Sequence, residues 1–360
     1  MLPNIHPEAH IPFRFSEGPC DARIAIVGET WGEAEERLGL PFQGGAGAEL
    51  NSWLERVGIE RSACFITNVF PFRPPGNKLE RLCVARKELA ADYPHSALYP
   101  RLFVPDALLS IAFPRLSIEL DTVRPNLIIA LGNPALWALT GRTGISKLRG
   151  TIMQASIQHL SPTPLKLLPT YHPAFIMRSY KLRPIALADM TLAASESAFP
   201  EICTPPRHAL IPETPAEIEA WFREHASALL SCDVETHAGQ ILCIGFAAAP
   251  DSALCIPFTD RKGKSYWSPQ DEAIVLRLLK LFLESGDFSL LFQNGMYDLA
   301  YLLSYDIHPR APEIHDTMLA HWALYPELPK DLGTLGSLYA SLPAWKSMRR
   351  AGSDKLKTED

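Results

Sequence analysis

The sequence predicts an α/β protein of two domains, the first of them a three-layer αβα sandwich around a parallel sheet. Two observations predict this fold class. In the first 200 residues, short apolar runs that suit buried strands alternate with stretches that suit helices. A proline-rich stretch without periodicity follows, and strand and helix patterns then begin again. The length of 360 residues also fits two domains.

The elements of the first domain are predicted in chain order. Strands are expected at residues 24–27, 64–69, 127–131 and 166–170, where apolar residues dominate. Leu50, Trp53 and Leu54 share one face of an amphipathic helix expected at 49–57. Further helices are expected from the third strand to residue 139 and at 175–178, and helical, proline-broken segments are expected over 79–122.

Polar side chains fall at the ends of these four strands, namely Glu29, Asn68, Asn133 and His172. The carboxyl ends of parallel strands meet at one edge of a sheet, where open α/β sheets bind their ligands. After the first strand, Phe42 offers an aromatic face, and Gly44 and two further glycines let the backbone approach a ligand. The sequence therefore predicts a ligand site at this edge. The alternative is an ordinary strand-to-helix turn with structural polar residues.

The proline-rich stretch sets the predicted limits of the domains at residues 1–200 and 213–360, with a linker at 201–212. Thr214 is expected to cap a helix at 215–225. Strands at 229–236 and 240–247 indicate a hairpin, and a strand at 289–294 leads into a helix at 296–300. Asp233 and Glu235 are two residues apart and project from one face of their strand, as a cation-binding pair or as a solvent-facing strand end.

Charge is unevenly distributed along the chain. The formal net charge of −6 disfavours a nucleic-acid partner. Between Asp121 and Asp189, however, there is no Asp or Glu, and eight Lys and Arg residues occur. We expect this segment to contact phosphates, with a solvated basic face as the alternative. The eight cations are Arg124, Arg142, Lys147, Arg149, Lys166, Arg178, Lys181 and Arg183.

Cysteine usage and hydropathy exclude several classes of protein. The 7 cysteines include no Cys-x-x-Cys, which argues for reduced thiols and against a disulfide framework or a zinc site. No apolar run is long enough to span a membrane, and residues 1–17 lack the core of a signal peptide. We therefore expect a cytoplasmic protein without a membrane partner.

Four segments of the first domain, taken in order, resemble the uracil-DNA glycosylase superfamily, most closely its family 4 and related branches. The segments are the Gly28-Glu29 turn with Pro41-Phe42-x-Gly44, Thr67-Asn68-Val69 with Arg73-Pro74-Pro75-Gly76-Asn77, Leu131-Gly132-Asn133, and Thr170-Tyr171-His172-Pro173. The resemblance covers about residues 20–195. It implies a glycosylase fold and an enzyme that acts on uracil in single- or double-stranded DNA. Gly44 and Asn133 would be among the residues that contact the substrate.

The resemblance also implies a role for each matching residue. Glu29 would position or polarise the attacking water, and His172 would stabilise the negative charge that develops on the leaving uracil. Phe42 would stack on the flipped base, and Asn68 would hydrogen-bond the uracil edge. Ala174 to Arg178 would press into the DNA where the base has left. Such a division of labour suits glycosidic cleavage, which builds positive charge on the sugar and negative charge on the base.

Two features depart from the family. Family 4 members usually hold an iron–sulfur cluster on four cysteines, but only Cys20 and Cys83 lie near suitable positions here, and Phe72 replaces an expected ligand. We therefore expect no cluster. Trp31 replaces the proline usual in the Gly-Glu-Ala-Pro-Gly turn, which leaves the preferred base open.

The second domain resembles the DEDD-type 3′–5′ proofreading exonucleases, particularly that of family A DNA polymerases. Asp233-x-Glu235 matches the first motif and Asn294-x-x-x-Asp298 the second, and His315-Asp316-Thr317 also matches. The resemblance implies a ribonuclease H-like fold with a mixed sheet, in which Asp233, Glu235 and Asp298 hold Mg²⁺ or Mn²⁺ and Asn294 contacts the substrate. The family's last acidic motif is not found after Asp316, so we expect an incomplete domain with little exonuclease activity of its own.

Together these observations predict a DNA repair or replication protein, phage- or bacterium-like, that excises uracil and carries an exonuclease-like domain. It would work in the cytoplasm of a bacterium or a phage-infected host. Two alternatives stay open. One is a non-catalytic module that binds uracil or a DNA end for a split or longer DNA polymerase. The other is a metal-dependent 3′–5′ exonuclease completed by a downstream polypeptide.

Overall fold

The computed structural model describes residues 15–85, 95–99, 102–155, 164–203, 206–226, 228–260 and 262–340. These residues form two compact units. The first comprises the described residues up to Ile202 together with those from Gly333 onward, and the second is Cys203–Leu332. The predicted domain limits, 1–200, 201–212 and 213–360, remain a prediction.

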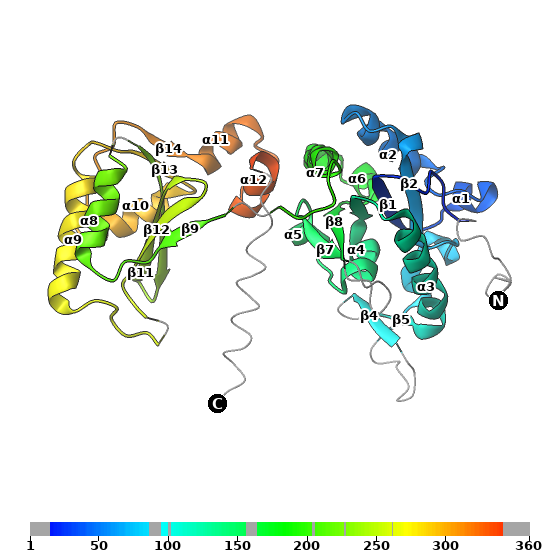
Figure 1. Ribbon diagram of the computed structural model, residues 1–360, viewed down its shortest axis with the longest axis horizontal. Coiled ribbons are helices and arrows are strands. Elements are labelled where there is room, and N and C mark those ends of the chain that lie inside the picture. Colours follow the sequence, from blue (N-terminus) through cyan, green and yellow to red (C-terminus); the bar gives the residue numbers. More distant parts are fainter. Residues whose placement is uncertain are drawn as a thin grey trace. The chain divides into compact units, whose positions relative to one another are not determined.

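A five-stranded sheet with the order β2-β1-β6-β8-β7 forms the centre of the first unit (Figure 1). β2, β1, β6 and β8 run parallel, as their apolar sequences predict. The sequence does not predict β7, which pairs antiparallel with β8 at the edge. The strands are β1 (Ile24–Thr30), β2 (Cys64–Phe70), β6 (Leu127–Leu131), β7 (Met153–Ala155) and β8 (Leu165–Thr170).

Helices on both faces of this sheet complete the predicted three-layer sandwich (Figure 1). α3 and α4 pack against β1, β2 and β6, whereas α7 packs against β6 and β8 and contacts α2. Residues such as Ile26 and Ile129 are fully buried, because both faces of the sheet are covered. The α-helices are α1 (Glu33–Leu38), α2 (Gly45–Arg56), α3 (Asp106–Val123), α4 (Gly132–Thr140), α5 (Ile145–Leu148), α6 (Pro173–Arg178), α7 (Arg183–Glu196) and α12 (Leu332–Tyr339). The 3-10 helices are η1 (Arg61–Ala63), η2 (Pro75–Asn77), η3 (Leu79–Leu82) and η5 (Tyr180–Leu182).

Two local predictions for this unit are wrong. α2 begins at Gly45 and not at residue 49, because Gly44 takes the extended N-cap position. The segment 79–122 is not only helical, since β3 (Val84–Ala85), β4 (His95–Tyr99) and β5 (Leu102–Pro105) form a small antiparallel sheet before α3. Aromatic and β-branched residues in β5 favour a strand, and Pro105 is followed directly by the helix.

The second unit contains a six-stranded mixed sheet with the order β14-β13-β10-β11-β12-β9. β10 and β11 form the predicted antiparallel hairpin, and β13 runs parallel to β10. Thr214 forms the predicted capping box with Glu217 at the start of α8. The strands are β9 (His208–Leu210), β10 (Leu229–His237), β11 (Gln240–Ala249), β12 (Ser252–Pro257), β13 (Ser289–Phe292) and β14 (Ile314–Asp316). The helices are α8 (Pro215–Glu224), α9 (Pro269–Leu283), α10 (Gly295–Ser304) and α11 (Thr317–Leu324).

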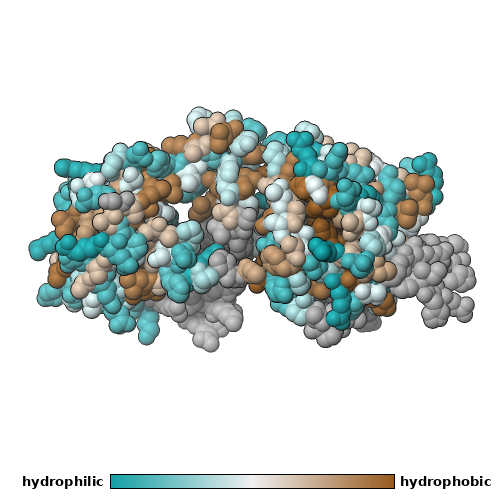
Figure 2. All heavy atoms as spheres, turned by 45° about the horizontal axis from the view of Figure 1, so that its top comes forward, coloured by the Kyte–Doolittle hydropathy of each residue, from teal (hydrophilic) through white to brown (hydrophobic). Residues whose placement is uncertain are grey.

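Hydrophobic and hydrophilic side chains are interspersed over the face seen in Figure 2. Large apolar residues are exposed in both units, for example Tyr180 with 65% and Met296 with 76% of its surface accessible. No helix among the described residues is both long enough and apolar enough to cross a bilayer.

Candidate active site

A pocket of about 1610 Å³ opens at the carboxyl ends of the parallel strands in the first unit. The chain leaves β1 toward β2 on one side and later returns to β6 on the other, and ligands bind at such switch points in open α/β sheets. The pocket lining includes all eight site residues predicted for this domain. They are Glu29, Phe42, Gly44, Asn68, Asn133, His172, Ala174 and Arg178.

Phe42 and His172 form an aromatic wall of the pocket. Their rings are stacked, with centroids 5.7 Å apart and planes inclined by 29°. Phe42 is buried and has a left-handed backbone with φ of 52°. A Cβ atom at Gly47 would lie 1.8 Å from the Phe42 carbonyl oxygen, so only glycine lets α2 pass this close to the loop.

Asn68 places its amide beside Phe42, because β1 leaves space for it. Gly28 and Asn68 are register partners in the parallel β1–β2 pair. A Cβ atom at Gly28 would lie 2.2 Å from Asn68 Oδ1 and 2.5 Å from the Phe42 ring. The Asn68 side chain is buried, and its Oδ1 has no hydrogen-bond partner among the described residues. A buried polar atom without a partner is costly, so a hydrogen-bond donor that reached Asn68 Oδ1 would be favourable there.

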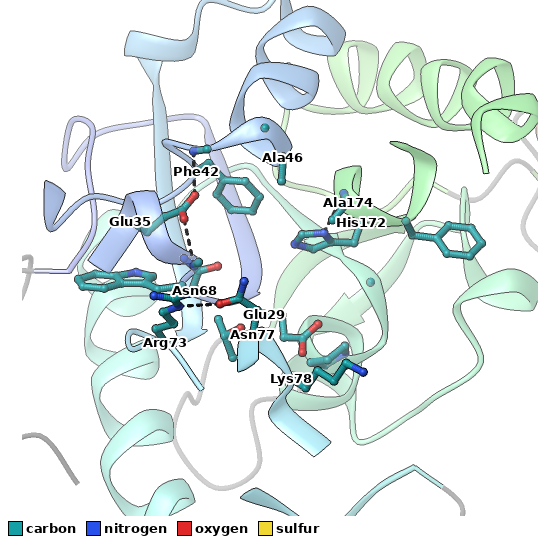
Figure 3. A pocket seen from close by; sticks show the side chains of 18 of the residues that line it. Glu29, Glu35, Phe42, Ala46, Asn68, Arg73, Asn77, Lys78, His172 and Ala174 are labelled. Atoms are coloured by element: carbon teal, nitrogen blue, oxygen red, sulfur yellow. Dashed lines mark hydrogen bonds between the residues drawn. The ribbon is translucent and has the colours of Figure 1, made fainter. Parts of the chain in front are cut away.

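Glu29 lies near the end of β1, where Figure 3 shows its carboxylate on the same side of the pocket as Lys78. The pKa of Glu29 is raised from 4.5 to about 7, chiefly because the carboxyl group is buried and to a smaller extent because Glu80 is negatively charged. The Arg178 guanidinium opposes this shift. The carboxyl group therefore exchanges a proton near neutral pH, which suits general acid–base work.

His172 is held as a neutral imidazole. Its Nδ1 accepts a hydrogen bond from the backbone N–H of Ala174 at 3.2 Å, which leaves the proton of the neutral ring on Nε2. Burial lowers the pKa of His172 to about 4, and the positive charge of Arg178 adds to this effect while Glu35 opposes it. At neutral pH the ring therefore offers an N–H donor without carrying a charge.

Glu35 is a central residue of the site that the sequence analysis missed. Its carboxylate accepts hydrogen bonds from the backbone N–H groups of Gly32, Gln43 and Gly44 at 3.0, 2.9 and 3.1 Å. These contacts tie the Gly28–Gly32 turn to the loop that carries Phe42 (Figure 3). The spacing of Gly32 and Glu35 fits a capping box, but no sequence pattern indicates the bonds to residues 43 and 44.

Charged groups line the outer part of the pocket. Arg73 donates to Asn77 Oδ1 at 2.7 Å (Figure 3). Arg73 also pairs with Glu36 at 3.2 Å. Arg37, Lys78 and Arg178 also line the pocket. Arg178 is among the predicted site residues, whereas Arg37, Arg73 and Lys78 are not, because these three lie outside the segment between Asp121 and Asp189 that contains no carboxylate.

The anion-free segment, which lies between Asp121 and Asp189, is not a continuous phosphate-binding surface. The prediction that it contacts phosphates is wrong for three of its residues. Arg149 is buried and pairs with Asp189, with Nε donating to Oδ2 at 2.8 Å. Lys166 is buried and donates to Glu196 at 3.0 Å, and Arg183 donates to Glu49 at 2.6 Å. The partner carboxylates come from outside the segment, so the local charge count does not reveal the pairs. The exposed cations are Arg124, Arg142, Lys147, Arg178 and Lys181.

Asn133 lines the pocket but also has a structural role. Its Oδ1 accepts hydrogen bonds from the backbone N–H groups of Gly144 and Ile145, both at 2.9 Å. These bonds fix the turn before α5. Because the oxygen is occupied, a contact between Asn133 and a substrate would use another atom.

In the second unit, Asp298 lies close to the β10 strand that carries Asp233 and Glu235. Asp298 Oδ1 accepts a hydrogen bond from the Val234 N–H at 2.7 Å. Burial raises the pKa of Asp298 to about 6, and the charges of Asp233 and Asp316 contribute to the increase. Within the part of the chain that the structure describes, no group of three or more His, Cys, Asp and Glu side chains is arranged to hold a metal ion. The predicted Mg²⁺ or Mn²⁺ site therefore stays a prediction.

Asn294 and Asp316 connect the remaining motifs of this unit. Asn294 is exposed and precedes α10 with a left-handed backbone. The Asp316 carboxylate accepts hydrogen bonds from the N–H groups of Asn294 and Gly295 and also caps α11. Asp316 thus fixes the position at which the helix with Asp298 begins.

Two of the similarities to known proteins are weak. Among solved structures, RNase D of Escherichia coli is similar over 41% of this chain and 36% of its own length, with 16% identity and a TM-score of 0.30. A DNA polymerase of Bacillus phage SP01 is 23% identical in an alignment of 337 positions that covers 85% of this chain and 33% of the polymerase. That alignment spans both units.

Similarity over the first unit is stronger. A type-4 uracil-DNA glycosylase of Thermotoga maritima is 33% identical over 183 residues, which are 50% of this chain and 80% of that protein. A type-4 uracil-DNA glycosylase of Pyrobaculum aerophilum is 33% identical over 172 residues, 46% of this chain and 74% of that protein. The family model of the uracil DNA glycosylase superfamily matches residues 15–193, which include the whole pocket. The chain therefore belongs to the uracil DNA glycosylase superfamily.

Proposed function

We propose that the chain excises uracil from DNA by hydrolysis of the N-glycosidic bond. One observation carries this proposal: a neutral histidine with a free Nε2–H and a carboxyl group with a pKa near 7 line the same pocket as a buried asparagine amide. A donor, a proton acceptor and a base-reading amide are the three groups that the reaction requires.

His172 stabilises the leaving base. As the glycosidic bond breaks, the bonding electrons move onto the pyrimidine, and a carbonyl oxygen of the base gains negative charge. The Nε2–H of the neutral imidazole donates to that oxygen. Because the ring carries no charge before the reaction, its hydrogen bond strengthens as the base becomes anionic, which lowers the barrier.

Glu29 acts on the sugar side. In its ionised form it orients a water molecule and accepts a proton as the water attacks the electron-deficient sugar carbon. The raised pKa of Glu29 makes it a stronger base than an exposed glutamate. The negative charge also stabilises the positive charge that develops on the sugar.

Phe42 and Asn68 select the base. The Phe42 ring supplies a face on which an extruded base stacks, and the Asn68 amide both accepts from and donates to the uracil edge. Cytosine presents an amino group where uracil presents a carbonyl, so a fixed amide discriminates between them. The cations Arg37, Arg73, Lys78 and Arg178 at the pocket rim would hold the phosphates on either side.

The test uses a 5′-labelled single-stranded oligonucleotide with one internal uracil and a nuclease-resistant 3′ end. The protein is incubated with it in EDTA, and alkali then breaks any abasic site. We expect a break at the uracil that is lost in His172→Ala. The break should remain in the control variant Glu33→Gln, because Glu33 lines the pocket but its carboxylate is exposed. Binding without a break would refute excision.

A second candidate is a reader that binds uracil for a DNA polymerase without cutting. Trp31 supports it, since this large buried side chain lines the pocket where the family usually has proline. The same oligonucleotide distinguishes the two: a reader binds it in a uracil-dependent way and leaves the base in place.

For the second unit we propose an exonuclease-like role at 3′ ends that another polypeptide completes. The position of Asp298 against the Asp233–Glu235 strand supports this. The described carboxylates do not form a three-ligand metal site by themselves, so we derive no metal-dependent step. Digestion of a 3′ end by this chain alone with Mg²⁺ or Mn²⁺ would contradict the need for a partner.

A further inference from the structure

The strand that carries Asn68 lies at an edge of its sheet. Among the described strands of the first unit, β2 is outermost in the order β2-β1-β6-β8-β7, so another strand covers only one of its sides. Carbonyl groups that point away from β1 therefore need hydrogen-bond donors from elsewhere. In the middle of β2, the Ile66 carbonyl accepts from the Glu17 N–H at 3.0 Å. Beyond Ile66, the donors come from a side chain of α3, the helix that packs against β2.

Arg115 of α3 binds three consecutive residues of β2. Its Nη2 donates to the carbonyl oxygen of Asn68 and, at 3.0 Å, to that of Val69. Its Nη1 donates to Thr67 Oγ1 at 3.1 Å. The guanidinium group is planar and presents its donors in a fixed geometry, so these bonds together fix the backbone at Asn68.

Glu119, one helical turn after Arg115, holds the guanidinium group in place. Arg115 Nη1 lies 2.7 Å from Glu119 Oε2, and the same oxygen accepts from Thr67 Oγ1 at 2.8 Å. The Glu119 side chain is completely buried, and only 14% of the Arg115 side chain is exposed. Charge-assisted hydrogen bonds in a buried place are strong and restrict motion, so the pair forms a rigid support for β2.

The Asn68 amide depends on this support. Its Oδ1 has no hydrogen-bond partner among the described residues, so its position follows from the backbone that carries it. The space is narrow, because a Cβ atom at Gly28 would lie 2.2 Å from Oδ1 and 2.5 Å from the Phe42 ring. A small shift of β2 would therefore move the amide relative to the aromatic wall, and a misplacement of about 1 Å can cost about 10²-fold in rate.

We propose, on the basis of the uracil excision proposed above, that Arg115 and Glu119 are positioning residues for base recognition. They fix the end of β2 so that the Asn68 amide meets the edge of the base. Neither residue belongs to the lining of the pocket, so both act through Asn68 and not by contact with the DNA.

The test is a double-mutant cycle on single-turnover excision of uracil in EDTA. Arg115→Lys keeps a positive charge beside Glu119, but its single ammonium group cannot replace the fork that binds two carbonyls and a hydroxyl. We expect Arg115→Lys to lower the rate about tenfold when Asn68 is present and less than about twofold in the Asn68→Ala background. If Arg115→Lys does not fold, as judged by circular dichroism, Glu119→Gln takes its place in the cycle with the same expectation.

Arg183→Lys is the matched control. The Arg183 side chain is 13% exposed, and it donates to Glu49 at 2.6 Å and to Ser52 at 2.8 Å. Both partners lie on α2 and not on β2. We expect Arg183→Lys to change the rate less than about twofold in either background.

The cycle separates this proposal from the proposed function. Equal losses in both backgrounds, or no loss at all in Arg115→Lys, would overturn the positioning role while excision by the unmodified chain stands. If the unmodified chain releases no uracil, excision is refuted, and the cycle is read on the ratio of dissociation constants for the uracil oligonucleotide and its cytosine counterpart. A ratio that Arg115→Lys leaves unchanged, or a ratio of one in the unmodified chain, would then overturn the positioning role as well.

Discussion

The ionised carboxylate of Glu29 lowers the stability of the folded protein, and one substitution removes this charge. Its pKa is about 7 in the folded protein against 4.5 ordinarily, so the unfolded chain loses this proton at lower pH than the folded one. The difference between the two pKa values corresponds to about 3 kcal/mol of lost stability at high pH. Because Glu29 is partly exposed, solvent screening reduces this cost, and we expect about 2 kcal/mol.

The sign follows from the direction of the pKa shift. Below the unfolded pKa both states are protonated, and there is no cost. The cost grows as pH rises between the two pKa values and is constant above the folded one. Glu29→Gln keeps the shape of the side chain without the charge, so it should raise the free energy of unfolding by about 2 kcal/mol at pH 8 and by less than about 1 kcal/mol at pH 5.

The assay must report on the first unit alone. Hydrogen exchange of the β1 and β6 peptides, read by mass spectrometry across a urea series, does so. Glu33→Gln is the matched control, because its side chain is 82% exposed, and we expect almost no effect at either pH. Equal stabilisation by Glu29→Gln at both pH values would show that the effect does not come from the charge of Glu29.

Three further predictions concern the same pocket. The kcat/KM of uracil excision should rise about tenfold per pH unit below pH 7 and level off above it, because Glu29 must be ionised while His172 is already neutral. A kcat/KM that falls as the pH rises through 7 would contradict this assignment. Gly28→Ala places a methyl group against Asn68 and Phe42, and the resulting steric strain of about 1–3 kcal/mol should lower the rate of excision at least about tenfold. The control Gly245→Ala should leave the rate unchanged, because the nearest atom to its methyl group would be 3.8 Å away. Glu35→Ala leaves three backbone N–H groups without their acceptor, so thermal unfolding should show a loss of about 2–3 kcal/mol, and an unchanged Tm would show that water replaces the carboxylate.

The strands and the polar residues after them could be predicted from the sequence. Parallel strands covered on both faces must be apolar throughout, so β1 and β6 are visible as uninterrupted runs. Their carboxyl ends must converge on one edge of the sheet. Residues as distant in sequence as Glu29 and His172 therefore had to come together, and both line the pocket.

Other features depend on contacts that sequence patterns do not encode. Glu35 stabilises the pocket through backbone N–H groups, and every residue type except proline supplies those. Arg149 is neutralised by Asp189 and also donates to Ser337 Oγ at 2.8 Å, 188 positions away. Whether a cation faces DNA or a buried carboxylate is decided by tertiary packing, which is why the anion-free segment was misleading.

Release of the free base is the most direct test of the central claim that His172 and Glu29 together cleave the glycosidic bond. A single-turnover reaction on a uracil-containing oligonucleotide in EDTA is quenched at intervals, and free uracil is quantified by mass spectrometry. We expect one uracil per oligonucleotide, with rates lower by about 10²–10³-fold in His172→Ala and Glu29→Gln. No release by a protein that binds the oligonucleotide, or undiminished release by both variants, would contradict it.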